Sequence, residues 1–349
     1  MQVLIIGGTR FIGPHVVRRL VGAGHNVTLF HRGQTQADLP ETVKHIYGDR
    51  QELSSFVAEF KAAALDVVLD MIPFTEEDAR GVVSVFKDLA RRLVAISSSD
   101  VYRAYGRLRR KEAGAPDPIP LEEGTPLREV LYPYRAQAQG EEDFKYHYEK
   151  ILVERTVMSN AELPGTVLRL PAVYGPNDPQ HRLFGYLKRM DDNRPFILLE
   201  EEQARWRWTR GYVENVADAI ALAVTDERAA GGIYNVGEAD ALAESGWVCS
   251  IGNAAEWIGE VITMPREQLP KHLLMDLDYS HHLATNTSRI RAELGYCERI
   301  SRPQALRRTI SWERLNPPSA ADSPQIDYQA EYAAEDEALA KLKQRGGVG

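Results

Sequence analysis

Cysteine is scarce in this sequence, and long apolar runs are missing. Cys249 and Cys297 are the only two cysteines among 349 residues and do not form a CxxC pair, which favours a reducing compartment and gives no support for a zinc site. No apolar stretch approaches the roughly 20 residues that span a bilayer. The glycine turn at Gly7 comes too early for a secretory signal peptide to precede the first strand. We therefore expect a cytoplasmic protein without a membrane partner.

Positive charge is not in excess either. The 42 Lys and Arg residues against 50 Asp and Glu residues leave a formal net charge of −8, and an acidic chain argues against nucleic acid as the main partner. The nine histidines form no ligand-spaced set with carboxylates, and the adjacent His281 and His282 would point apart. The sequence therefore predicts no metal site, and a small molecule rather than nucleic acid as the partner.

The sequence does contain a regular alternation of strand-like runs and segments of helical spacing. The strand-like runs are Val3–Ile6, Val27–Phe30, Lys44–Tyr47, Leu65–Ile72, Arg92–Ser98, Thr166–Pro176 and Gly232–Glu238, and the helical segments are Phe11–Val21, Glu52–Lys61, Glu76–Arg91 and Glu141–Ser159. This alternation predicts an α/β fold with a doubly wound parallel Rossmann sheet. The carboxyl ends of such strands share one edge, where ligands bind.

We expect a dinucleotide-binding half followed by a smaller C-terminal substrate domain. Residues 1–175 are assigned to the Rossmann domain, with 211–236 returning to it, residues 176–210 and 237–315 to the substrate domain, and residues 316–349 to a linker and a solvent-facing tail or helix. Within the first half, Tyr102–Gln139 is rich in Pro, Arg and Glu and is interpreted as a long loop. Loops of this length are often functional.

A glycine turn joins the first strand to the first helix. Gly7 lets the chain turn sharply, and Gly13 lets the helix pack close to the sheet. The helix N-terminus offers unpaired N–H groups and a partial positive charge, both suited to a pyrophosphate. The predicted cofactor contacts in this turn are Gly7, Thr9, Arg10, Phe11, Ile12 and Gly13.

Two arginines near this turn bear on the choice of cofactor. The second strand ends in His31 and Arg32, where an NAD site commonly has an acid for the ribose 2′-hydroxyl. Arg10 lies in the first turn of a helix, where a cation costs roughly 0.3–1 kcal/mol unless an anion lies beside it. We hypothesise that Arg10 and Arg32 bind a 2′-phosphate, so that NADP is favoured over NAD. The alternative is two solvated surface arginines. Asp49 would accept a hydrogen bond from the adenine amine, or cap the helix that follows.

A tyrosine and a lysine share one face of the predicted helix at Glu141–Ser159. Tyr146, Lys150 and Glu154 are spaced i, i+4 and i+8. A phenol with a pKa near 10 is a poor acid or base at neutral pH, and a lysine ammonium one turn away lowers that pKa. The same lysine can hydrogen-bond a nicotinamide ribose. Tyr148 lies nearby but has no lysine four residues on.

A cluster of serines ends the strand before the long loop. The segment ISSSDVY, from Ile96 to Tyr102, places hydroxyl groups at the ligand-binding edge of the sheet. A hydroxyl there can hydrogen-bond a substrate oxygen and hold it against Tyr146. The alternative role of these serines is to cap the end of the strand.

Seven motifs occur in order along the chain. They are GGTRFIG, SSSDVY, YHYEKILVE, LRLPAVYGP, TRGYVENVADA, YNVGE and NTSRIRAELGY, and they cover nearly everything from Met1 to about Trp312. With them the sequence resembles the extended short-chain dehydrogenases/reductases of the NAD-dependent epimerase/dehydratase family. The glycine motif and DVYRAYGRL look closest to an atypical branch related to chloroplast stem-loop RNA-binding proteins. The resemblance also implies a homodimer formed through the helices that include the Tyr–Lys helix.

The resemblance implies a role for each matched residue. It makes Tyr146 the acid/base, Lys150 its activator and Ser98 the catalytic hydroxyl, with Ser99 as the close alternative. The remaining implied contacts are Asp100 beside the substrate, Pro171, Ala172 and Val173 at the nicotinamide, and Arg210 at the diphosphate of a nucleotide-sugar.

Four departures from the family pattern weaken the case for a nucleotide-sugar. Arg10 replaces the middle glycine, and Ala172 replaces an asparagine that contacts the sugar-nucleotide. The Arg-Pro-Gly-Asp motif is absent, leaving only Arg266 in that region, and the interval from Ser98 to Tyr146 is longer than usual. The resemblance therefore supports cofactor use better than it supports a nucleotide-sugar substrate.

The sequence favours an NAD(P)-dependent epimerase/dehydratase-type oxidoreductase acting on a nucleotide-sugar or a similar hydroxyl or carbonyl substrate. One alternative is a simple NADPH-dependent carbonyl reductase. Another is a dinucleotide-binding RNA-interaction protein without redox turnover, for which the basic stretch Arg103–Lys111 is the best support. Trp206 and Trp208 would stack on a substrate ring, or pack in the core of the second domain.

Overall fold

The computed structural model describes residues 1–319 and 326–346. Its centre is a seven-stranded sheet with the order β10-β6-β5-β4-β1-β2-β3, in which every neighbouring pair is parallel. The strands are β1 (Gln2–Ile6), β2 (Asn26–His31), β3 (Lys44–Tyr47), β4 (Val67–Asp70), β5 (Arg92–Ser98), β6 (Gly165–Leu170) and β10 (Ile233–Asn235). The predicted doubly wound α/β fold is thereby confirmed.

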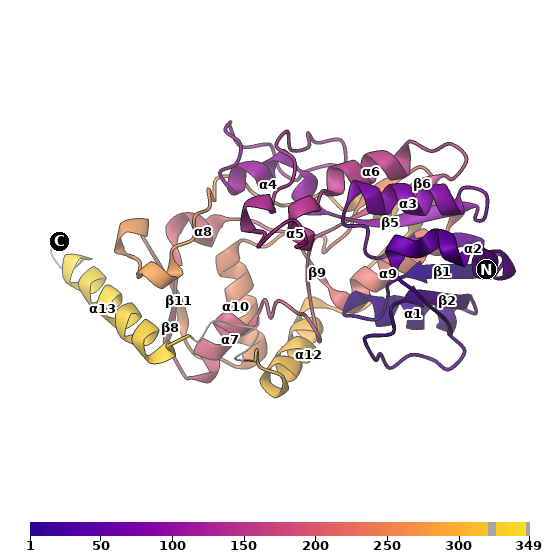
Figure 1. Ribbon diagram of the computed structural model, residues 1–349. Helices are drawn as coiled ribbons and strands as arrows, with labels where there is room; N and C mark the ends of the chain where they lie inside the picture. The colour runs from indigo at the N-terminus through magenta and orange to yellow at the C-terminus, as the bar shows by residue number, and fades with distance from the viewer. Residues whose placement is uncertain (320–325, 347–349) are drawn as a thin grey trace.

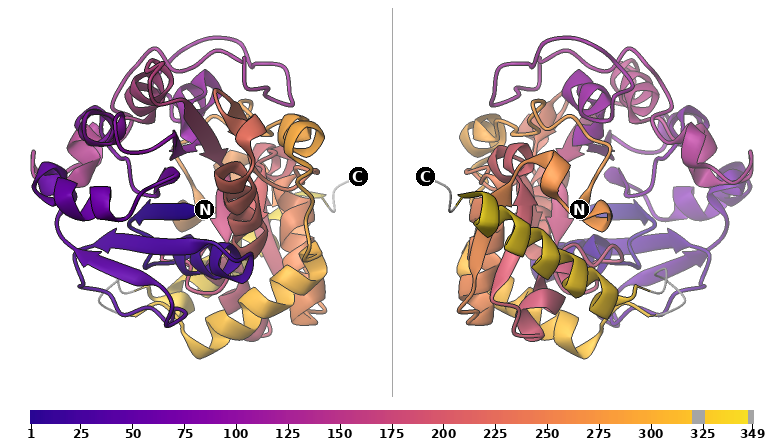
Figure 2. Two further views of the ribbon diagram at one scale, coloured as in Figure 1. Left: turned by 90° about the vertical axis from the view of Figure 1, so that its right-hand side faces the viewer. Right: turned by 90° about the vertical axis from the view of Figure 1, so that its left-hand side faces the viewer.

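Helices cover both faces of the sheet (Figures 1 and 2). Side chains of β1 alternate between two apolar clusters, with Val3 and Ile5 in one and Leu4 and Ile6 in the other, as expected for a strand buried on both faces. The helices on the two faces are α1 (Ile12–Gly22) and α9 (Val213–Thr225) on the first, and α2 (Val57–Ala62), α3 (Glu76–Phe86) and α6 (Lys150–Met158) on the second. The strand order reverses beside β1, which is where ligands bind in such sheets.

A second group of elements lies beside the carboxyl edge of the sheet. Its strands form two parallel pairs, β7 (Ala172–Tyr174) with β9 (Arg210–Tyr212), and β8 (Phe196–Glu200) with β11 (Glu260–Met264). Its helices are α7 (Phe184–Asp191), α8 (Glu201–Arg205), α10 (Glu244–Ala255) and α12 (Arg302–Leu315), whereas α11 (Ser288–Leu294) packs against β10 and α9 of the sheet layer. The domain boundaries given above stay a prediction.

Two segments differ from the sequence-based expectation. The expected loop at Tyr102–Gln139 contains the helix α4 (Arg103–Leu108). The expected single helix at Glu141–Ser159 is two helices, α5 (Phe144–His147) and α6, because Tyr148 and Glu149 are extended with ψ of 119° and 98°. Short 3-10 helices, at Arg50–Phe56, Ser99–Val101, Arg135–Gln137, Glu227–Ala229, Arg266–Gln268 and Lys271–Leu273, complete the fold.

The C-terminal helix α13 (Tyr328–Gly346) packs against the second group of elements. Ala338 and Leu339 are buried against Phe196 and Met264, and α13 lies at the end of the molecule opposite the seven-stranded sheet (Figures 1 and 2). We expected a solvent-facing tail or helix in this region. A helix is present, but one of its faces is apolar and covered, so it is not wholly solvent-facing. The parts of that expectation on residues 320–325 and 347–349 lie outside the described residues.

Among residues 1–319 and 326–346, no helix combines the length and the hydropathy that crossing a lipid bilayer requires.

Candidate active site

The glycine turn after β1 has backbone geometry that only glycine adopts readily. Gly7 and Gly8 have φ of 88° and 86°, in the left-handed region. Gly13 is required for a different reason: a Cβ there would lie 2.4 Å from the backbone of Gly8. The first turn of α1 therefore touches the turn that precedes it, as the sequence predicted for close packing.

The N-terminus of α1 is open to an anion. Its N-cap residue, Phe11, makes no side-chain cap hydrogen bond, and the first turn holds no acidic residue in the described chain. Free N–H groups and the positive end of the helix macrodipole thus meet at this point. Thr9, two residues before Phe11, and Ile12, the residue after it, lie in the same segment. The turn and the helix end fit the pyrophosphate of a dinucleotide.

The two arginines implicated in cofactor choice are both exposed. Arg10 Nε donates a hydrogen bond to Thr35 Oγ1 at 3.1 Å, which draws it toward the loop that follows β2 and holds Arg32. At the end of β2, Nε2 of His31 lies 2.8 Å from Nδ1 of His45. Burial and the neighbouring His45 lower the pKa of His31. Basic side chains thus gather where β2 ends.

Asp49 takes the capping role left open above. Its carboxylate accepts a hydrogen bond from the backbone N–H of Gln51 at 3.0 Å. Its role toward the adenine stays a prediction. The next residue, Arg50, is paired with Asp70 at 3.0 Å and with Asp78 at 2.8 Å, so it fastens the end of β4 to the start of α3.

Lys150 is buried at the centre of the site. Its Nζ donates hydrogen bonds to the carbonyl oxygens of Pro73 at 2.7 Å and Ile96 at 2.9 Å. Burial lowers the pKa of Lys150 to about 8, against an opposing effect of Asp100. The ammonium group is therefore held between the ends of β4 and β5, where the sequence places the reactive groups.

The helix break separates Tyr146 from Lys150. Tyr146 lies in α5, where its hydroxyl donates to Glu141 Oε1 at 3.3 Å and the guanidinium of Arg135 lies 4.8 Å from its ring centroid. The expected common helical face of Tyr146, Lys150 and Glu154 is therefore wrong, since two extended residues intervene. The catalytic role of Tyr146 stays a prediction.

Tyr148 occupies the position expected of Tyr146. It is buried, and its ring centroid lies 5.7 Å from the Nζ of Lys150. Burial and the neighbouring Asp100 raise the pKa of Tyr148 well above its ordinary value, and the nearby Ser98 acts in the opposite direction. Its hydroxyl donates to Asp100 Oδ2 at 2.9 Å. Sequence spacing missed this residue because it assumes an unbroken helix.

The residues that follow β5 form the rest of the group. Ser98 Oγ accepts a hydrogen bond from the backbone N–H of Asp100 at 3.2 Å, so it also caps the short helix there. Asp100 is buried and accepts a second tyrosine hydroxyl, that of Tyr134, at 3.0 Å. Burial raises the pKa of Asp100, and Arg128 opposes this. Ser99 is buried beside them.

Glu154, the third member of the predicted helical face, has a structural partner instead. Its carboxylate pairs with Arg169 at 2.7 Å and accepts the hydroxyl of Ser97 at 2.5 Å. These contacts tie α6 to β5 and β6 beneath the site.

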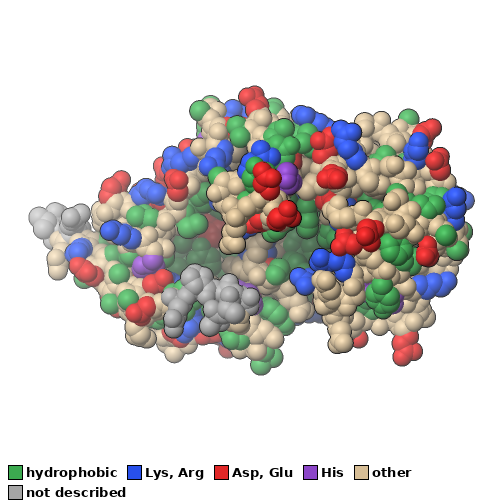
Figure 3. All heavy atoms as spheres, in the orientation of Figure 1, with side chains coloured by type: hydrophobic (Ala, Val, Ile, Leu, Met, Phe, Trp, Pro, Cys, Tyr) green, Lys and Arg blue, Asp and Glu red, His purple; other side chains and the backbone are tan. Residues whose placement is uncertain are grey.

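A pocket of about 180 Å³ lies among β7, β9, α7 and α10. It is lined by Ala172, Tyr174, Arg182, Tyr186, Trp208, Arg210, Glu244 and Trp247. Figure 3 shows this face hollowed between the sheet and the second group of elements, with hydrophobic side chains in the hollow. Val173, a predicted nicotinamide contact, is buried beside it, and Pro171 is half-buried at the end of β6.

Arg210 in this pocket has a partner that sequence reasoning missed. Its Nη2 is hydrogen-bonded to Glu244 Oε2, and its guanidinium lies 4.4 Å from the ring centroid of Trp247. Both partners lie on α10, more than thirty positions along the chain, and neither belongs to a matched motif. Trp206 packs in the core, whereas Trp208 lines the pocket.

Part of the positive charge of the basic stretch Arg103–Lys111 is paired with nearby acids. Arg103 pairs with Asp117, to which Arg107 is a second, longer partner at 3.8 Å. Arg110 lies 3.3 Å from Asp276. These pairs leave less free positive charge for a phosphate backbone than the sequence indicates.

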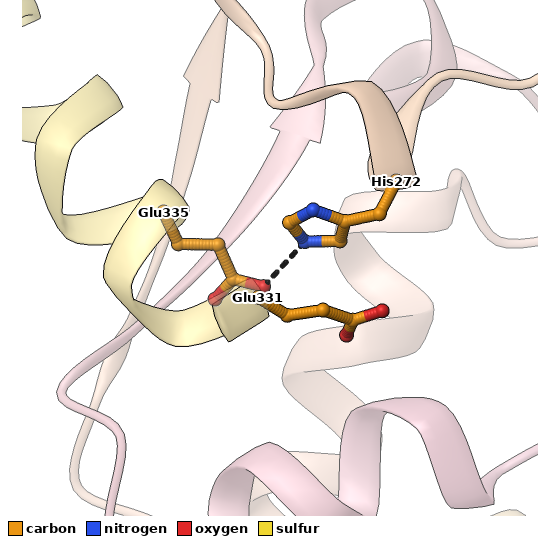
Figure 4. Close-up of side chains that lie close together, drawn as sticks. All are labelled: His272, Glu331 and Glu335. Atoms are coloured by element: carbon orange, nitrogen blue, oxygen red, sulfur yellow. Dashed lines mark hydrogen bonds and ion pairs between the residues drawn. The ribbon is translucent and has the colours of Figure 1, made fainter. Parts of the chain in front are cut away.

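A separate cluster of metal-ligand type lies under α13 (Figure 4). His272 Nε2 lies 3.0 Å from Glu335 Oε1, and Glu331 is one helical turn away. Arg189 already donates to Glu331 at 2.8 Å and to Glu335 at 2.7 Å, so a cation would compete with a guanidinium. The expectation of a chain without metal stays a prediction.

Comparison with known sequences supports one family. The sequence model of the NAD dependent epimerase/dehydratase family matches residues 3–237. The chloroplast stem-loop binding protein of 41 kDa b from Arabidopsis thaliana is 26% identical over 252 residues, covering 67% of this chain and 58% of that protein. The 2′-dehydrokanamycin reductase of Streptomyces kanamyceticus is 28% identical over 242 residues, covering 66% and 60%. The chain thus matches about three fifths of the length of each.

Solved structures share the fold. The UDP-glucose-4-epimerase of Stenotrophomonas maltophila, with bound NAD and formylated UDP-arabinopyranose, superposes with a TM-score of 0.68 at 17% identity, covering 90% of this chain and 98% of that one. The epimerase Mth375 of Methanothermobacter thermautotrophicus gives a TM-score of 0.65 at 19% identity, covering 90% and 92%. At these identities the likeness concerns the fold alone.

Proposed function

Because the chain belongs to the NAD-dependent epimerase/dehydratase family, we propose that it exchanges hydride between a nicotinamide dinucleotide and a sugar-type hydroxyl or carbonyl substrate. The observation that carries this proposal is the burial of Lys150 against the carbonyl of Ile96. It brings an ammonium group, the phenol of Tyr148 and the hydroxyl of Ser98 to the ligand-binding edge of the sheet.

The cofactor side of the site is proposed to favour NADP over NAD. The open N-terminus of α1 and the turn at Gly7 suit the pyrophosphate, and Arg10 with Arg32 would hold the 2′-phosphate. Lys150 would bind the nicotinamide ribose, with Pro171 and Val173 beside the ring. When bound, the nicotinamide supplies or takes up the hydride.

The proton is proposed to pass through Tyr148 rather than Tyr146. Its hydroxyl lies at Asp100, and Ser98 is its neighbour and can orient the substrate oxygen. The ammonium of Lys150 favours the phenolate electrostatically once the proton has left. Tyr146 would keep the proton role only if α5 and α6 joined into one helix on binding substrate.

Two kinds of turnover suit this arrangement. Some structures of this fold hold nucleotide-sugars, such as UDP-glucuronic acid with NAD, which supports epimerase or dehydratase chemistry with the hydride returned to the substrate. The relationship to a 2′-dehydrokanamycin reductase supports net reduction of a ketone. We propose Arg210, Ser99 and Asp100 as the substrate side of the site in either case.

The first experiment is to identify by mass spectrometry the dinucleotide and any small molecule that co-purify with the protein. The second uses deuterium at C4 of the reduced cofactor with the substrate so identified. Net reduction leaves deuterium in the product and consumes the absorbance at 340 nm, whereas epimerisation and dehydration leave that absorbance unchanged. A protein that binds neither NAD nor NADP would contradict the proposal.

An RNA-interaction role is the remaining alternative, and the acid partners of Arg103 and Arg110 argue against it. A gel-shift assay with a stem-loop RNA at low and high salt tests it. Binding that weakens when Arg107, Arg109 and Arg110 are neutralised would favour RNA over a small substrate.

A further inference from the structure

The pocket of about 180 Å³ lies next to the proposed nicotinamide contacts, because Ala172 is among its lining residues. Its other lining groups are mainly aromatic rings and two arginines. The charge state of those arginines decides which substrates can enter, since a diphosphate needs positive charge that is not already compensated.

The first arginine is compensated by a buried carboxylate. Arg210 is 7% exposed and Glu244 6%, and the two are hydrogen-bonded through Nη2 and Oε2. The hydroxyl of Tyr186 donates to the other carboxylate oxygen, Oε1, at 2.8 Å. Glu244 is thus fixed on both oxygens, and its negative charge lies where a diphosphate bound to Arg210 would have to lie.

The second arginine is also occupied. Arg182 Nη1 donates to Asp178 Oδ1 at 2.6 Å and to the carbonyl oxygen of Val173 at 2.8 Å. Asp178 is buried. Each cationic side chain that lines the pocket therefore has an acidic partner within the described chain, and the lining as a whole is close to neutral.

The remaining surface suits a ring. Tyr174 and Trp247 meet edge to face with centroids 5.0 Å apart, and Trp208 presents a further indole whose Nε1 is buried without a hydrogen-bond acceptor among the described residues. Such a donor is normally satisfied in proteins. The volume is below the range of about 300–1,000 Å³ that drug-sized ligands occupy, which fits one sugar ring better than a whole nucleotide-sugar.

We propose that this pocket binds a phosphate-free, hydroxyl-bearing ring of the sugar type, with Glu244 excluding the diphosphate of a nucleotide-sugar. The aromatic rings would cover the apolar C–H face of the sugar, while Glu244 and the indole N–H of Trp208 bond its hydroxyls. This inference rests on the proposed function and narrows its substrate class.

The test measures binding by ligand-observed NMR with the full chain saturated with NADP. The probes are methyl α-glucoside and UDP-glucose. We expect the wild-type protein to bind the glucoside in the millimolar range, and to bind UDP-glucose no more tightly than the glucoside. Glu244→Gln should raise the affinity for UDP-glucose at least tenfold, because it leaves the charge of Arg210 uncompensated. The same substitution should lower the affinity for methyl α-glucoside.

Two further variants secure the result. Glu201→Gln, at an exposed position on α8, is the matched control and should change neither affinity. Trp208→Ala should lower the affinity for methyl α-glucoside, and it tests the pocket even if Glu244→Gln fails to fold. Tight binding of UDP-glucose by the wild type, or no binding of the glucoside, would overturn the inference. Failure to bind either NADP or NAD would instead refute the proposed function, and binding of both dinucleotides is measured separately.

Discussion

The hydroxyl of Tyr148 donates a hydrogen bond to Oδ2 of Asp100 at 2.9 Å. Asp100 follows the central strand β5, and Tyr148 lies in the extended break between α5 and α6. The bond therefore ties the end of the sheet to the segment that carries Lys150. The phenol of Tyr148 therefore contacts Asp100 through its hydroxyl, while its ring centroid lies 5.7 Å from the Nζ of Lys150.

Replacing Tyr148 by Phe should lower kcat for a confirmed substrate by about 100-fold or more, the usual contribution of a positioned acid or base. The matched control is Tyr146→Phe. It removes a hydroxyl whose one hydrogen bond within residues 1–319 and 326–346 is to Glu141 at 3.3 Å, and it should leave kcat within a few-fold. Initial rates of product formation from that substrate, followed by mass spectrometry for both variants, provide the measurement. The reverse ranking would restore the role predicted from the sequence for Tyr146.

Lys150 should make the free energy of unfolding depend on pH between about pH 7.5 and 10.5. Its pKa is about 8 in the folded chain, against 10.5 for an unperturbed lysine. Between these pH values the unfolded chain binds more protons, so the free energy of unfolding rises with pH. Relative to Lys150→Met, the free energy of unfolding of the wild type should increase by up to about 3 kcal/mol between pH 7.5 and 10.5. Urea unfolding across this range measures it, and parallel pH profiles of the two proteins would contradict the assignment.

Gly13→Ala should damage both the fold and the cofactor site. The added Cβ would lie 2.4 Å from the backbone of Gly8, and such overpacking costs about 1–3 kcal/mol. NADP affinity should fall as well, because the turn must shift. Gly22→Ala, in the same helix with nothing within 4 Å, should stabilise by about 0.5–1 kcal/mol. Thermal unfolding and NADP titration distinguish the two variants.

Arg32→Ala and Arg10→Ala should each weaken NADP binding about tenfold or more and leave NAD binding nearly unchanged. A charge-assisted hydrogen bond to a phosphate contributes about 1.5–3 kcal/mol, and NAD has no 2′-phosphate. Arg18→Ala, which removes an exposed pair with Asp38, serves as the control. Equal affinities of the wild type for NAD and NADP, measured by calorimetry, would refute the preference.

Glu335→Ala should weaken the packing of α13 against the rest of the protein. Glu335 is 1% exposed and pairs with the mostly buried Arg189 at 2.7 Å, and removing one partner of a buried pair costs about 3–5 kcal/mol. Amide hydrogen exchange across α13 should accelerate. Glu337→Ala, at an exposed pair with Lys341, should leave exchange almost as in the wild type. No difference between the variants would mean that apolar contacts alone hold the helix.

The sequence predicts the sheet well because each strand is specified by its own residues. Arg92–Ser98 and Lys44–Tyr47 are strands with the predicted bounds. The Tyr–Lys helix was predicted less well because its break depends on distant partners. Glu149 pairs with Arg128 at 3.0 Å and caps Ile151, and a local spacing rule cannot register an ion pair that spans a long loop.

The pocket shows the same limit. Arg210 was matched to a motif, but its charge is balanced by Glu244, which local patterns do not connect to it. The first turn of α10 holds Glu244, and only the tertiary structure brings it beside Arg210 on β9. The sequence therefore predicts the geometry of the glycine turn more completely than the partners of Arg210 in the pocket.

In the turn after β1, the requirement for close packing and the proposed contact with the cofactor fall on different residues. Position 13 must be glycine for the helix to pack against the turn, because any side chain there would collide with the backbone of Gly8. Position 10, three residues earlier, carries an exposed arginine whose hydrogen bond is to a loop. Under the proposed role of Arg10, substitutions at position 10 would change coenzyme preference without placing a side chain against the backbone of Gly8.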